Sequence, residues 1–124
     1  MILQRTIKKP VETIGIGLHS GCRVVMRLLP APVNYGIVFR RVDIANKPEI
    51  KCDPFSINDT TLSSTLIVDN VKVATVEHLM SALACYGVDN LIIEISDEEI
   101  PIMDGSSNSF LYLFIIRFSL DVLI

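Results

Sequence analysis

The hydrophobic and polar positions of the chain follow two periods, one typical of strands and one typical of a helix. The run RVVMRLL at residues 23–29 places its two arginines on one face and Val24, Met26 and Leu28 on the other. This alternation predicts a strand with one buried face, ended by a proline at the next position. Gly36–Val42 is a second candidate strand.

A hairpin and an interior strand are predicted further along. Leu62–Val68 and Val71–Ala74 read as the two arms of the hairpin, joined by Asp69 and Asn70. Aspartate and asparagine tolerate positive φ and suit a tight two-residue turn. Asn90–Ile95 (NLIIEI) is short, β-branched and apolar, which favours a strand inside a sheet.

One helix is predicted between the hairpin and that strand. Thr75 is its expected N-cap and Gly87 its expected left-handed C-terminal residue. Glu77 and His78 then lie in the first turn. Apolar residues recur at helical spacing on one face, namely Val76, Leu79, Met80, Leu83 and Ala84.

The C-terminal third is harder to assign. Residues 96–109 (SDEEIPIMDGSSNS) read as a loop pinned inward by Ile100, Ile102 and Met103, and a second helix capped by Asp104, Ser106 or Ser107 follows it. Phe110–Ile124 is almost continuously apolar and predicts a core helix, or a helix covered by a partner. It is too short, and too interrupted by charge, for the ~20 apolar residues of a membrane span.

Composition narrows the class of protein. With 124 residues, half of them hydrophobic, the chain is expected to form a single domain. Eleven basic against fourteen acidic residues give no broad cationic surface, which argues against nucleic-acid binding. Three cysteines without a close pair favour a reducing compartment, and the N-terminus has no apolar signal region, so a cytoplasmic location is expected.

Glu77 and His78 are the first candidate residues for a metal-dependent active site. The positive end of the helix dipole favours an ionised Glu77 and disfavours a protonated His78, which are the forms that a metal hydrolase requires. The order is reversed relative to the H-E-x-x-H motif, and no second ligand follows on the helix, because Cys85 is ~10 Å further along the axis. Taken alone, a first-turn histidine of this kind is more often a structural residue that hydrogen-bonds locally than a metal ligand.

The other histidine, His19, lies in GIGLHSG at residues 15–21. A dinucleotide-binding fingerprint requires a third glycine where Ser20 stands, and a helix where a strand is predicted. The glycines instead indicate a turn that needs positive φ or a close backbone approach. His19 at such a turn could contact a ligand, but the residues alone favour a loop histidine that is satisfied by local hydrogen bonds. The small hydroxyl residues at 63–65 lack a nucleophile elbow, so serine catalysis is not expected.

Four stretches together resemble one family: QRTIKKPVETIGIGLHSG, GIVFRRVD, DTTLSSTLIVDNVKVATVEHLMSALACYGVDN and EIPIMDGSSNSF. From residue 1 to about 114 they are similar to the N-terminal half of the zinc-dependent UDP-3-O-acyl-N-acetylglucosamine deacetylases of lipid A (lipopolysaccharide) biosynthesis. The resemblance implies an α+β domain, a sheet packed against helices in a two-layer sandwich, which is the first of the family's two similar domains.

The resemblance also implies roles for single residues. His78 matches a Zn²⁺ ligand, and Glu77 matches the general base that activates water. His19 matches a histidine near the active site, and Leu62 and Ser63 fall in a stretch bordering the substrate passage, so all three are expected to bind the substrate, UDP-3-O-acyl-N-acetylglucosamine.

The sequence differs from the family in its length and in its C-terminal residues. Family members are about twice this length, and their remaining zinc ligands, a histidine and an aspartate, belong to a second domain that these 124 residues do not include. Residues 115–124 form an apolar tail that departs from the family pattern. Because catalytic zinc normally takes three protein ligands, the chain alone is predicted to be inactive. The alternative is a truncated or non-catalytic interaction domain that docks through this tail.

Overall fold

A computed structural model describes residues 3–52, 57–59, 64–102, 112 and 120–123. They form an α+β domain, as predicted, in which a five-stranded mixed sheet packs against one helix. The elements are β1 (Gln4–Ile7), β2 (Val11–Ile16), β3 (Arg23–Pro30), β4 (Ile37–Arg41), β5 (Glu49–Lys51), β6 (Ile57–Asp59), β7 (Ser64–Val68), β8 (Val71–Ala74), α1 (Glu77–Cys85), β9 (Leu91–Ile95) and β10 (Leu120–Leu123).

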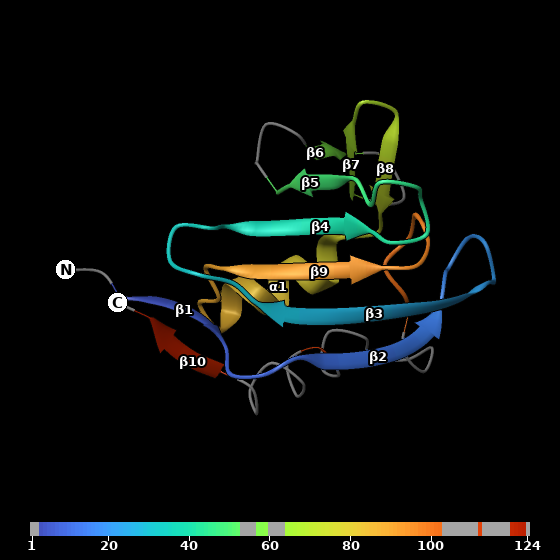
Figure 1. Ribbon diagram of the computed structural model, residues 1–124. Coiled ribbons are helices and arrows are strands. Elements are labelled where there is room, and N and C mark those ends of the chain that lie inside the picture. The colour runs from blue at the N-terminus through green and yellow to red at the C-terminus, as the bar shows by residue number, and fades with distance from the viewer. Residues whose placement is uncertain (1–2, 53–56, 60–63, 103–111, 113–119, 124) are drawn as a thin grey trace.

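The main sheet has the order β2-β3-β9-β4-β5, so the strand that comes last in sequence lies at its centre (Figure 1). β9 pairs antiparallel with β3 and parallel with β4. The predicted interior strand is therefore confirmed. Leu91, Ile93 and Ile95 are completely buried, which explains why this segment is made of branched apolar residues.

One face of the sheet forms the core against α1. The predicted alternation of β3 is confirmed, because Val24, Met26 and Leu28 are buried while its arginines are exposed. Leu79, Ala82 and Leu83 form the buried face of α1. The predicted face was wrong at Ala84, which is exposed, because the helix turns the positions around Leu79 and Leu83 toward the sheet.

The helix ends as predicted. Gly87 has a φ of 66°. Its N–H bonds to the carbonyl of Ala84 at 3.2 Å, and the N–H of Val88 bonds to the carbonyl of Leu83 at 2.9 Å. These two bonds form a Schellman motif, which satisfies carbonyl groups at the end of the helix and requires a residue that accepts the left-handed conformation.

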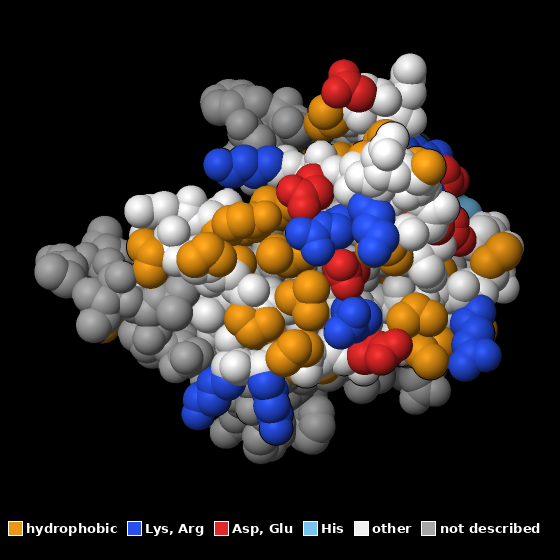
Figure 2. All heavy atoms as spheres, in the orientation of Figure 1, with side chains coloured by type: hydrophobic (Ala, Val, Ile, Leu, Met, Phe, Trp, Pro, Cys, Tyr) orange, Lys and Arg blue, Asp and Glu red, His pale blue; other side chains and the backbone are white. Residues whose placement is uncertain are grey.

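The opposite face of the sheet carries a row of alternating charges across four strands. Glu94 of β9 accepts hydrogen bonds from Arg27 of β3 at 3.4 Å and from Arg40 of β4 at 3.0 Å. Arg40 also pairs with Glu49 of β5 at 2.6 Å. Figure 2 shows this face, with the charged side chains lying between apolar ones. Opposite charges on neighbouring strands support the sheet on the face away from α1.

The predicted hairpin is confirmed in the part that the structure describes. β7 and β8 pair antiparallel, and Asp69 and Asn70 between them have φ values of 51° and 65°, as a two-residue hairpin turn of this kind requires. The Arg41 guanidinium links the hairpin to the main sheet by donating to the carbonyl of Lys72 at 2.8 Å.

The C-terminal expectation was wrong for Leu120–Leu123. These residues form β10, an antiparallel partner of β1, rather than part of a helix. The free edge of β1 offers backbone hydrogen bonds, and tertiary pairing of this kind overrides local preference. Tyr112 is helical, whereas the proposed caps Asp104, Ser106 and Ser107 lie outside the described residues. None of the described helical segments is long and apolar enough to cross a membrane.

Candidate functional site

A strained turn connects β8 to α1 and places Glu77 and His78. Thr75 lies between the strand and the helix with a φ of 58°, a conformation that a β-branched residue rarely adopts. The predicted N-cap role of Thr75 was wrong. Val76 is the N-cap residue, and within the described part of the chain no side chain caps the helix and the buried hydroxyl of Thr75 has no hydrogen-bond partner. Left-handed backbone at Thr75 turns the chain away from the extended path that a capping threonine requires.

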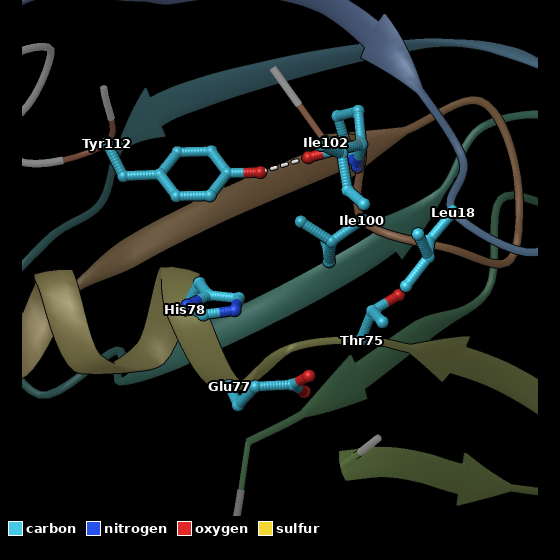
Figure 3. A pocket seen from close by; sticks show the side chains of 8 residues that line it. Leu18, Thr75, Glu77, His78, Ile100, Ile102 and Tyr112 are labelled. Atoms are coloured by element: carbon cyan, nitrogen blue, oxygen red, sulfur yellow. Dashed lines mark hydrogen bonds between the residues drawn. The ribbon is translucent and has the colours of Figure 1, made fainter. Parts of the chain in front are cut away.

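Glu77 and His78 line one pocket of about 170 Å³ (Figure 3). Glu77 is half-buried and His78 is exposed. Both side chains extend from the first turn of α1 toward the region that Leu18 and Ile100 border. The lining residues are Leu18, Thr75, Glu77, His78, Ile100, Pro101, Ile102 and Tyr112. The site therefore combines a carboxylate and an imidazole with apolar walls.

The wall opposite the helix is the segment Glu98–Ile102, which lies between β8 and β2. The N–H of Ala74 bonds to the carbonyl of Glu98 at 2.7 Å, and the N–H of Ile100 bonds to the carbonyl of Ala74 at 3.0 Å. Ile102 exchanges two backbone hydrogen bonds with Ile16 of β2, at 2.8 and 3.1 Å. Sequence reasoning treated this segment as a loop, but its backbone is paired on both sides.

Tyr112 supports the same wall. Its hydroxyl donates a hydrogen bond to the carbonyl of Pro101. Burial raises the pKa of Tyr112 well above its ordinary value of 10.0, because the phenolate would be poorly solvated. Tyr112 therefore keeps its proton, and its hydrogen-bond donor, over the neutral pH range.

The glycines of GIGLHSG have the explanation that the sequence indicated. An added Cβ would lie 2.7 Å from the carbonyl oxygen of Ile102 at Gly15, and 2.5 Å from Oε1 of Glu99 at Gly17. Gly21 has a φ of 68°. Two glycines thus permit a close approach by the segment Glu98–Ile102, and the third permits the turn that brings Leu18 to the pocket.

His19 lies in this turn, and its partner was not found by sequence reasoning. Glu99 accepts the backbone N–H of His19 at 3.0 and 3.2 Å and lies 2.5 Å from the ring nitrogen Nδ1. The Glu99 side chain is 5% exposed and that of His19 is 50% exposed. Nothing in the run DEE distinguishes Glu99 from Asp97 and Glu98, which are less buried, because the burial of Glu99 follows from contacts with residues 80 positions away.

The site can offer part of a metal centre. His78 presents an imidazole and Glu77 a carboxylate, which are donor types that Zn²⁺ accepts. No group of three His, Cys, Asp or Glu residues suited to a metal ion occurs within the described ranges. The residues fit one zinc ligand with an adjacent base, and further ligands would have to come from elsewhere. Leu62 and Ser63, the other expected substrate-binding residues, lie outside the described residues.

The family model for UDP-3-O-acyl N-acetylglycosamine deacetylase matches residues 4–117 of this chain. The chain belongs to this family. All residues that line the pocket fall within the matched region.

Curated relatives agree with this assignment. Proteins named UDP-3-O-acyl-N-acetylglucosamine deacetylase from Chromobacterium violaceum and Saccharophagus degradans are 57% and 56% identical, each over 91% of this chain. One from Neisseria meningitidis is 55% identical over 90% of the chain. The matches cover 37–38% of those relatives, so the chain spans less than two fifths of their length.

Proposed function

We propose that this chain supplies one half of the active site of a zinc-dependent deacetylase that hydrolyses the N-acetyl group of UDP-3-O-acyl-N-acetylglucosamine. The observation that carries the proposal is the placement of Glu77 and His78 side by side in the first turn of α1, both lining one pocket. Membership of the deacetylase family and the names of the relatives support the substrate class.

In this proposal His78 is one protein ligand of the metal, and Zn²⁺ supplies Lewis-acid polarisation of the amide carbonyl and makes water more acidic. The Glu77 carboxylate accepts a proton from the water that attacks the acetamide carbon. The C–N bond then breaks, acetate is released, and the proton passes to the amine of the sugar. The apolar residues Leu18, Ile100 and Ile102 limit the access of bulk water to the reacting groups.

We also propose that the 124-residue chain has no deacetylase activity by itself, because a catalytic zinc site normally has three protein ligands. Purified chain supplied with Zn²⁺ and UDP-3-O-acyl-N-acetylglucosamine should release no more acetate than its Glu77→Gln variant. Acetate release clearly above that of the variant would contradict this part of the proposal.

A chimaera tests the site residues directly. Residues 4–117 of this chain replace the matching region of the Chromobacterium violaceum relative, which is 57% identical. The chimaera should deacetylate the substrate. Glu77→Gln should lower kcat by about 10²–10⁴-fold, the range expected for a general base, without loss of zinc. His78→Ala should lower the zinc content as well.

The matched control is Glu12→Gln, which removes an exposed carboxylate from β2. It should leave both kcat and zinc content unchanged. An active chimaera that tolerates Glu77→Gln as well as it tolerates Glu12→Gln would contradict the role of Glu77. Full zinc occupancy in the His78→Ala variant would contradict the role of His78.

A further inference from the structure

Glu99 is a buried carboxylate that, among the described residues, accepts hydrogen bonds from His19. Both of its oxygens accept the backbone N–H of His19, and Oε2 also faces Nδ1 of the imidazole. A buried carboxylate is costly unless it is paired and hydrogen-bonded, so these contacts hold Glu99 and His19 together. They join residues that the β-structure on either side already places close, since Ala74 pairs with Glu99 and Ile16 with Ile102.

The contact fixes the protonation of one ring nitrogen. An ionised carboxylate only accepts hydrogen bonds, so we infer that Nδ1 of His19 is the donor across the 2.5 Å contact with Oε2. This leaves Nε2 as the ring nitrogen that can contact a ligand, on a side chain that is half exposed. A carboxylate behind an imidazole sets the tautomer and the ring orientation in the same way at other histidine sites.

The same contact fixes the turn that carries Leu18 into the pocket. The turn is closed by hydrogen bonds from the N–H of Gly17 to the carbonyl of Cys22 and from the N–H of Gly21 to the carbonyl of Gly17, both at 2.9 Å. Glu99 holds the middle of the turn through the N–H of His19. It can approach because Gly17 has no side chain, as a Cβ there would lie 2.5 Å from Oε1.

We propose that Glu99 is a positioning residue of the candidate site. It holds the turn so that Leu18 lines the pocket, and it presents Nε2 of His19 as a hydrogen-bonding group for the polar part of the substrate. The proposal rests on the function proposed above, because the substrate contact belongs to that reaction. The tautomer of His19 and the order of the turn are properties of the chain itself.

The first test is therefore made on the purified 124-residue chain. ¹⁵N chemical shifts of the His19 ring should show a protonated Nδ1 at neutral pH, and the amide proton of His19 should exchange slowly with solvent. Glu99→Gln should speed exchange of that amide, whereas Glu98→Gln, which changes an exposed neighbouring carboxylate, should not. An unprotonated Nδ1 in the unmodified chain would overturn the proposal.

The second test uses the chimaera and separates the two effects of Glu99. Asparagine at position 19 keeps an N–H donor where Nδ1 lies but has no counterpart of Nε2. His19→Asn should therefore leave the turn ordered and raise KM roughly tenfold with little change in kcat, the loss expected for one hydrogen bond to substrate. Glu99→Gln should raise KM at least as much, and Glu98→Gln should not.

Gly17→Ala perturbs the same contact sterically, because the new Cβ would lie 2.4 Å from Oγ of Ser20 and 2.5 Å from Oε1 of Glu99 and would displace both side chains. It should reproduce the KM effect of Glu99→Gln, and thermal unfolding of both variants checks that they are folded. If the unmodified chimaera is inactive, the proposed function fails and the ring tautomer and amide exchange decide this proposal. If the chimaera is active and His19→Asn has an unchanged KM, the substrate contact of His19 is overturned.

Discussion

Arg41 binds Asp43 through two parallel hydrogen bonds, from Nε to Oδ1 at 2.9 Å and from Nη2 to Oδ2 at 2.7 Å. The Arg41 side chain is only 8% exposed, and its remaining nitrogen reaches the carbonyl of Lys72 in the hairpin. The pair therefore stabilises the junction between β4 and the hairpin that leads into α1.

The Arg41–Asp43 pair predicts a loss of stability in acid. Hydrogen bonding to Arg41 lowers the pKa of Asp43 below its usual 3.8. The folded state therefore favours the ionised form of Asp43. The stabilisation that ionised Asp43 gives to the folded chain is fully present above the pKa that Asp43 has in the unfolded chain. It is lost as the pH falls through the lower pKa that Asp43 has in the folded chain. Asp43→Asn should lower the free energy of unfolding by about 1–3 kcal/mol at pH 7 and by much less at pH 2.

Urea denaturation of both proteins between pH 2 and pH 8 measures this difference. Asp69→Asn, which changes an exposed hairpin-turn residue to one that also tolerates positive φ, is the control and should change stability little at any pH. A difference between the Asp43→Asn variant and the unmodified chain that stays constant down to pH 2 would rule out the ion pair as its cause.

The burial of Tyr112 predicts that the folded chain loses stability at high pH. Burial raises the pKa of Tyr112 in the folded state above 10.0. The contribution of protonated Tyr112 to the free energy of unfolding is therefore present below pH 10 and is lost as the pH rises further. Tyr112→Phe should remove this alkaline dependence. It should also cost about 1 kcal/mol at pH 7, because the carbonyl of Pro101 loses its donor.

Phenolate absorbance at 295 nm provides the measurement for Tyr112. The chain has three tyrosines, and the signal of one of them should rise only on unfolding in the unmodified chain. The Tyr112→Phe variant should lack that late signal. Full ionisation of all three tyrosines in the folded chain near pH 10 would contradict the buried position of Tyr112.

Two identical substitutions should change stability in opposite directions. The hydroxyl of Thr75 is buried without a partner among the residues that the structure describes, whereas that of Thr6 donates to the carbonyl of Asn90 at 2.6 Å and accepts the N–H of Ala31 at 3.1 Å. Thr75→Val removes an unsatisfied polar group and should raise the free energy of unfolding by about 1 kcal/mol. Thr6→Val leaves two buried groups unpaired and should lower it by about 1–3 kcal/mol.

Thermal and chemical denaturation of both threonine variants give the sign directly. Because valine is β-branched like threonine, the left-handed backbone strain at Thr75 is unchanged by the substitution. A destabilised Thr75→Val variant would mean that the hydroxyl has a partner in solution.

Gly15→Ala should disturb the wall of the pocket. The new Cβ would lie 2.7 Å from the carbonyl oxygen of Ile102 and 2.8 Å from Cβ of Pro101, so β2 and the wall must separate. We expect the free energy of unfolding to fall by about 1–3 kcal/mol. We also expect faster amide exchange at Ile16 and Ile102, which share two backbone hydrogen bonds. Unchanged exchange at both amides would show that the wall adapts without loss of pairing.

The features that sequence predicted correctly are those encoded within a few neighbouring residues. The alternation of residues 23–29, the turn at Asp69 and Asn70 and the end of α1 at Gly87 depend on local periodicity or on φ preference. Glu77 and His78 were placed correctly in the first turn for the same reason, since the apolar spacing of the helix fixes its start to within a residue or two.

The features that sequence missed depend on distant contacts. Thr75 has the residue type of an N-cap, but the pairing of Ala74 with the segment Glu98–Ile102 fixes a left-handed turn there instead. β1 and β10 each depend on a partner strand more than 100 residues away. Glu99 looks like a solvent-exposed acid until His19 is placed beside it.

The central position of β9 determines when the fold can form. β2 and β3 form one hairpin and β4 and β5 another, and in the five-stranded sheet only β9 joins them. A nascent chain that has emerged only as far as Gly87 has no strand to connect the two hairpins and no sheet on which α1 can pack. The last strand of the sheet to be synthesised therefore completes the sheet, and the long-range contacts of β9 are expected to make formation of the whole sheet slow relative to formation of its local hairpins.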